Sequence, residues 1–179
     1  MIETAFWRRL DVTGHDAARI ETTSDGHRLQ GTAVFRHEDE PAAISYRLDL
    51  APDWSTLRGL LRGFVGAEML EHEILRGPDG WTLDGAAQPG LGHLLDLDLG
   101  FTPATNLQQL RRVPLEIGEA ADIKVAWFDV GAERLVVLPQ YYRRLDANRY
   151  AYRGFSYQAT LELAPSGFVR LYPELWAMA

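Results

Sequence analysis

The chain has 179 residues, of which 46% are hydrophobic and 24% are charged, as is usual for a soluble globular domain. Its formal net charge of −7 argues against non-specific binding to nucleic acid or to an anionic membrane surface, because both require a basic face. The absence of cysteine excludes a disulfide, a thiolate metal site and a cysteine nucleophile.

Alternating apolar and polar residues, separated by Gly, Pro and Asp, predict many short strands. The predicted strands are residues 6–10, 18–23, 29–36, 44–50, 81–83, 113–118, 123–130, 135–138, 160–163 and 168–172. The alternation is clearest in 44–50, and Pro165-Ser166-Gly167 predicts a hairpin between the last two strands. We expect Trp7, in the first strand, to belong to the core.

The segment 54–75 fits two structures. Its leucines follow helical spacing, which is typical of an amphipathic helix. However, Gly59, Gly63 and Gly66 would each cost about 1 kcal/mol inside a helix. Two strands, 56–64 and 68–75, joined by a turn at Gly66 are therefore favoured. The whole pattern predicts an all-β sandwich, barrel or roll in one domain, residues 1–179.

The segment 94–112 is the densest mixture of polar and apolar residues in the chain. Three leucines alternate with Asp96 and Asp98, so the carboxylates share one face of a predicted strand. Gly100 then allows a bend, and Thr102-Pro103 has the composition of a helix start. A short helix carrying Arg111 and Arg112 near its end is predicted to follow.

This polar segment has several possible roles. An internal ion pair between Asp96 or Asp98 and an arginine is the commonest role for such residues. The same side chains could form a polar rim at the mouth of an apolar cavity, where arginine meets a phosphate or carboxylate and the acids meet sugar hydroxyls. A catalytic carboxylate pair is a third reading. His93 with the two aspartates is a weak pattern for a metal site.

Tyrosines and arginines gather in a second group, over residues 141–157. This pattern indicates cross-strand aromatic and cation–π packing, or a wall that stacks on sugar rings and grips an anionic head group. The group consists of Tyr141, Tyr142, Arg143, Arg144, Arg149, Tyr150, Tyr152, Arg153 and Tyr157.

These residues resemble the pattern of a bacterial glycolipid-binding family that was formerly a domain of unknown function. The resemblance rests on Asp96-x-Asp98-x-Gly100-Phe101-Thr102-Pro103-Ala104-Thr105-Asn106, on Arg111-Arg112, on Gln140-x-Tyr142, on Gly167-Phe168-Val169-x-x-Tyr172 and on Trp7. It implies a spiral β-roll, a curled and largely antiparallel sheet that is similar in outline to the open half-barrels of lipoprotein-localisation factors. It implies no catalytic residues.

Three functions follow as hypotheses. The first is a non-enzymatic binder or carrier of a glycolipid or other amphiphile, with acyl chains on an apolar concave face. The second is a hydrolase of a sugar or lipid ester that uses Asp96 and Asp98, and the third is a protein-interaction domain without a small ligand. The candidate ligand-binding residues are Asp96, Asp98, Thr105, Asn106, Arg111, Arg112, Gln140 and Tyr142. We expect no metal, cofactor or nucleic-acid partner. No apolar run approaches the roughly 20 residues of a membrane span and no signal-peptide pattern is present, so we expect a cytoplasmic protein.

Overall fold

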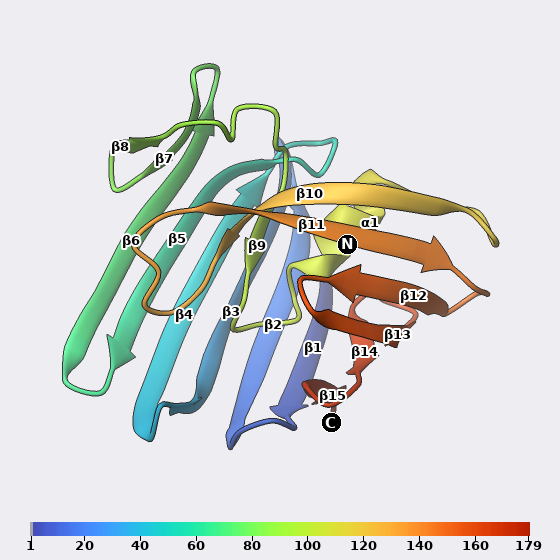
Figure 1. Ribbon diagram of the computed structural model, residues 1–179, viewed down its shortest axis with the longest axis horizontal. Helices are drawn as coiled ribbons and strands as arrows, with labels where there is room; N and C mark the ends of the chain where they lie inside the picture. The colour runs from blue at the N-terminus through green and yellow to red at the C-terminus, as the bar shows by residue number, and fades with distance from the viewer. Residues whose placement is uncertain (1) are drawn as a thin grey trace.

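A computed structural model describes residues 2–179 as a curled sheet of 15 strands with one short helix (Figure 1). The first eight strands are β1 Ile2–Arg9, β2 Gly14–Thr23, β3 Gly26–His37, β4 Glu40–Leu50, β5 Thr56–Val65, β6 Glu68–Gly77, β7 Gly80–Leu83 and β8 Ala86–Gln88. They are followed by β9 Leu97–Leu99, α1 Asn106–Arg112, β10 Ala120–Phe128, β11 Val136–Arg144, β12 Arg149–Gly154, β13 Tyr157–Leu163, β14 Val169–Tyr172 and β15 Trp176–Met178. The predicted all-β fold with a curled, open sheet is confirmed. Within residues 2–179, no helix has the length and hydropathy of a membrane-spanning segment.

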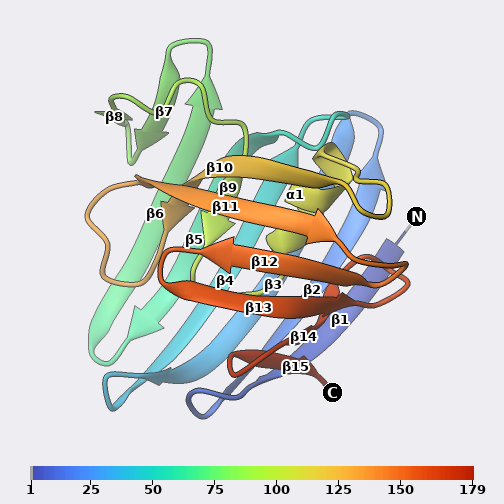
Figure 2. The same ribbon diagram turned by 45° about the vertical axis from the view of Figure 1, so that its right-hand side comes forward.

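The order of the strands explains the curl. The sheet runs from β8 back to β1, continues into β15, and then runs back to β9. Strands β1 and β15 join the two parts, with Trp7 opposite Met178. Figure 2 shows the result: β1–β6 form one layer, β10–β15 form a second layer across it, and β9 and α1 lie between the two. All neighbouring strands are antiparallel except β9 and β10, which are parallel.

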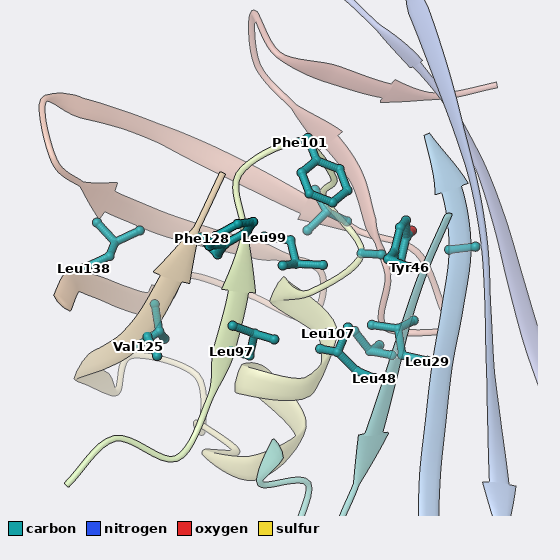
Figure 3. Packing of buried hydrophobic residues seen from close by; sticks show 14 of the residues in the cluster. Leu29, Tyr46, Leu48, Leu97, Leu99, Phe101, Leu107, Val125, Phe128 and Leu138 are labelled. Atoms are coloured by element: carbon teal, nitrogen blue, oxygen red, sulfur yellow. The ribbon is translucent and has the colours of Figure 1, made fainter. Parts of the chain in front are cut away.

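A packed core fills the space between the layers. Trp7 is fully buried, and its Nε1–H donates to the carbonyl of Val169 at 2.6 Å, which ties the first strand to β14. Leu97 of β9 and Leu107 of α1 lie between the side chains of the two layers (Figure 3). The inner faces of both layers are therefore covered by side chains from β9 and α1. The apolar concave face that we expected to hold acyl chains is therefore occupied by protein side chains.

Two local predictions from the sequence are confirmed. The ambiguous segment 54–75 forms β5 and β6, which pair antiparallel around the turn at Gly66, where φ is +58°. Positive φ suits glycine, because it has no Cβ to clash with the backbone. The predicted hairpin across Pro165-Ser166-Gly167 is present as the β13–β14 pair. In both cases the turn residues lie between the strands that they join.

Two other predictions are wrong. The helix begins at Asn106 rather than at Pro103. The hydroxyl of Thr102 does accept from the N–H of Ala104, as an N-cap residue does, but the chain then forms a turn, in which the N–H of Leu107 donates to the carbonyl of Ala104 at 3.3 Å. Residues 113–118 form no strand. A turn replaces it, in which the N–H of Glu119 donates to the carbonyl of Glu116 at 3.0 Å.

Candidate functional site

Strand β9 and helix α1 carry a row of polar side chains into the protein interior. Six of the eight predicted ligand-binding residues are buried, namely Asp96, Asp98, Thr105, Asn106, Gln140 and Tyr142. Arg112 is partly buried and Arg111 is exposed. The structure therefore brings most of the predicted residues together, but it places them below the surface rather than on an open rim. That they bind a ligand stays a prediction.

Asp96 and Arg112 form the ion pair that the sequence predicted. The Asp96 side chain is 0% exposed, and Nε of Arg112 donates to its two oxygens at 2.8 and 3.1 Å. This hydrogen bonding, together with the nearby negative charge, raises the pKa of the Arg112 guanidinium. A buried carboxylate needs such a partner, because an unpaired charge in the core is strongly destabilising. The pair fixes the end of α1 against the start of β9.

Asp98 makes different contacts, all with neutral side chains. Its Oδ1 accepts from the hydroxyl of Thr105 at 2.5 Å, and its Oδ2 accepts from the amide of Gln140 at 2.7 Å. The amide of Asn106 donates to the hydroxyl of Tyr142 at 2.7 Å, and that hydroxyl lies within donating distance of Gln140, at 3.2 Å. These bonds hold Asp98 and Asn106 in fixed positions.

Burial raises the pKa of Asp98 to about 6, and the hydrogen bonds from Thr105 and Gln140 offset only part of this effect. The carboxyl is therefore ionised at neutral pH and protonated in mild acid. Carboxylate oxygens retain acceptor capacity beyond two hydrogen bonds, so Asp98 can accept another donor. In the part of the chain that the structure describes, no group of three or more His, Asp or Glu side chains is arranged to hold a metal ion.

Asp98 and Asn106 border a pocket of about 280 Å³. Its floor is formed where β9 passes through Gly100 into the bend at Thr102-Pro103. Aromatic side chains form most of the remaining wall. They belong to Trp127, Tyr152, Phe155, Tyr157, Tyr172 and Trp176. We call this the aromatic pocket.

Phe155 stands at the edge of the aromatic pocket and is 62% exposed. It occupies the two-residue turn between β12 and β13 at a φ of +45°, an uncommon conformation for a bulky side chain. Its ring meets Trp127 edge-on, with the ring centroids 5.4 Å apart. Two-residue hairpin turns commonly require a positive φ, so the turn itself sets the position of this ring.

The predicted packing of the tyrosine and arginine group is confirmed. Tyr152 contacts Tyr142 of the neighbouring strand β11, with ring centroids 5.0 Å apart, and Tyr172 of β14, at 5.5 Å. The guanidinium of Arg153 lies 5.0 Å from the ring centre of Tyr141. This packing holds the tyrosine rings of the aromatic pocket in place.

Sequence reasoning missed Trp127, Phe155 and Trp176. Asp98 and Trp127 are opposite residues of the parallel β9–β10 pair, and 28 residues of chain separate them. Nothing in the local pattern of either segment indicates this pairing. The sequence feature that comes nearest to indicating this contact is Gly100. A Cβ at this position would lie 2.9 Å from the Trp127 ring and 2.6 Å from the carboxyl of Asp129, so the close approach requires glycine.

Comparisons with known proteins agree on the family and the fold. Residues 4–178 match the model of the family described as "Putative glycolipid-binding". The crystal structure of a DUF1089 family protein from Pseudomonas aeruginosa has the same fold, with a TM-score of 0.78 and 25% sequence identity. The alignment covers 90% of this chain and 91% of that one. No curated protein matches the chain.

Proposed function

The chain belongs to this glycolipid-binding family, and we propose that it binds the sugar head group of a glycolipid in the aromatic pocket. The observation that carries the proposal is the placement of Asp98 and Asn106 beside a wall of aromatic rings. The volume of about 280 Å³ lies near the lower limit for small-molecule pockets, and it suits one sugar ring.

The chemistry of the pocket matches the two sides of a sugar. The C–H face of a pyranose is apolar and packs on aromatic rings, whereas its hydroxyl groups donate hydrogen bonds. Trp127 and Trp176 supply large rings that lose little conformational freedom on binding. Asp98 supplies an ionised acceptor, and hydrogen bonds to an ionised acceptor are stronger than those between neutral groups.

The lipid part of the ligand leaves the pocket beside Phe155. The Phe155 side chain is 62% exposed, so an alkyl stem can pack on its ring. Because the core between the two layers is filled, the acyl chains lie outside it. We therefore propose a binder or carrier that holds the head group and leaves most of the lipid outside the core.

A binding role fits these carboxylates better than the hydrolase alternative. A catalytic pair would need both Asp96 and Asp98 at the ligand, but Asp98 lines the pocket whereas Asp96 is fully buried and bonded to Arg112. A protein-interaction domain without a small ligand would need no pocket of this kind. The aromatic pocket therefore favours a small ligand over a protein partner.

The proposal is tested by titration with octyl glucoside below its micelle concentration, followed by tryptophan fluorescence. An octyl ether of oligoethylene glycol is the control, because it has the same chain without a sugar. We expect the glucoside to bind and the ether not to bind. Trp127→Ala and Asp98→Asn should each weaken glucoside binding about tenfold or more. Equal binding of both surfactants, or full affinity in both variants, contradicts the proposal.

A further inference from the structure

The outer face of strands β1–β5 carries a hollow of about 890 Å³. It lies on the side of this layer that faces away from the core. Ala17, Thr32 and Ser45 point to this side, because they alternate with buried residues of β2, β3 and β4. Their small side chains form the floor, and longer side chains such as Phe6 and Leu60 form the walls.

The charged side chains that line this hollow are all cationic. Four arginines line it, namely Arg19, Arg47, Arg58 and Arg62. Among residues 2–179, no Asp or Glu side chain belongs to the lining. In a chain with a formal net charge of −7, this concentration of cations points to an anionic ligand.

Each of the four arginines pairs with a carboxylate that does not belong to the lining. Arg19 pairs with Glu21 at 2.7 Å, and Arg47 pairs with Asp49 at 2.9 Å. The arginine side chains of these two pairs are 41% and 40% exposed, and such exposed ion pairs contribute little to stability. A guanidinium has five N–H donors, so it can keep its partner and still bind a second carboxylate.

Two of these donors lack a partner. The Nε–H groups of Arg19 and Arg58 are buried from solvent and make no hydrogen bond within residues 2–179. Because these Nε–H groups are shielded from solvent, a ligand in the hollow meets the terminal N–H groups of the two arginines, whose side chains are 41% and 43% exposed.

We propose that this hollow is a second ligand site, which binds the carboxylate of a fatty acid. The carboxylate is held by Arg19 and Arg58, and the alkyl chain lies on the floor at Ala17 and against Phe6 and Leu60. This site is separate from the aromatic pocket and does not depend on the sugar-binding proposal. A neutral sugar carries no charge that could pair with the arginines. A fatty acid offers a carboxylate to the arginines and an alkyl chain to the apolar floor.

The test is isothermal titration calorimetry of the whole chain with decanoate and, separately, with decyltrimethylammonium, both below their micelle concentrations. The two probes share the alkyl chain and differ in the sign of the head-group charge. The negative net charge of the protein favours the cation, so a preference for decanoate requires a local cationic site. We expect decanoate to bind more tightly. Equal affinity, tighter binding of the cation, or no binding of decanoate overturns the proposal.

Variants then place the binding in the hollow. The double variant Arg19→Gln/Arg58→Gln should weaken decanoate binding about tenfold or more. Arg170→Gln is the matched control, because Arg170 of β14 pairs with Glu162 of β13 and neither residue lines the hollow. Ala17→Trp fills the floor without changing the charge, and it should abolish binding.

Full affinity in the double variant or in Ala17→Trp overturns the proposal. Trp127→Ala, which alters the aromatic pocket, should leave decanoate binding unchanged. Failure of the fatty-acid site and failure of the sugar site are therefore told apart.

Discussion

Replacing Arg112 by Met should destabilise the protein strongly, because it leaves the carboxylate of Asp96 buried without a counter-ion. The Asp96 side chain is 0% exposed, and that of Arg112 is 19% exposed. Removing one partner of a buried ion pair typically costs about 3–5 kcal/mol, which is a large part of the roughly 5–15 kcal/mol that stabilises a typical domain. Met keeps most of the apolar stem, so the change reports mainly on the lost charge.

The neighbouring Arg111 provides the matched control. It is exposed, donates to the carbonyl of Ser166 at 2.9 Å and lies 5.9 Å from the ring centre of Trp54. Arg111→Met should cost about 1 kcal/mol. The double variant Asp96→Asn/Arg112→Met should recover much of the loss, because no charge is left in the core.

Urea denaturation at pH 7 measures the free energy of unfolding of each of these variants. If Arg112→Met loses less than about 1 kcal/mol, or no more than Arg111→Met, then the Asp96–Arg112 pair does not hold β9 and α1 together.

Three further predictions follow from the same contacts. Burial raises the pKa of Asp98 from 3.8 to about 6, so the folded protein binds the proton of this carboxyl more tightly than the unfolded chain does. The stability that this proton provides is lost as the pH rises from about 4 to about 6. Relative to wild type, Asp98→Asn should therefore gain of the order of 3 kcal/mol between pH 4 and pH 7 in urea unfolding, and a pH-independent difference would contradict this. Tyr142→Phe leaves the amide of Asn106 without its acceptor and should lower the melting temperature by the equivalent of about 1–3 kcal/mol, so an unchanged melting temperature would argue against the network. Gly31→Ala places a Cβ 2.3 Å from the hydroxyl of Tyr46 and should cost about 1–3 kcal/mol in the same assay, whereas a neutral result would mean that this tyrosine moves freely.

The sequence predicts the strands of this protein better than it predicts the site. Strands β5 and β6 could be recognised because they are neighbours joined by a turn whose glycine has the required freedom, so the information is local. The ion pair of Asp96 and Arg112 could be predicted as one of several pairings, because both residues lie in one short segment.

The aromatic pocket could not be predicted in the same way. It depends on the parallel contact between β9 and β10, which sets Asp98 opposite Trp127. It also depends on the return of the chain to β15, which brings Trp176 to the same wall. The burial of Asp98 and Asn106 likewise follows from the second layer closing over β9, and no local alternation of residues indicates such a long-range contact.

The most direct test of sugar binding in the aromatic pocket is a ¹H–¹⁵N NMR spectrum of the tryptophan indole N–H groups, recorded with and without octyl glucoside. Trp127 and Trp176 line the pocket, whereas Trp7 and Trp81 donate their indole N–H to backbone carbonyls in the core. We predict that the signals of Trp127 and Trp176 shift on binding while those of Trp7 and Trp81 stay in place. Binding of the glucoside with no change at Trp127 and Trp176 would contradict the central claim.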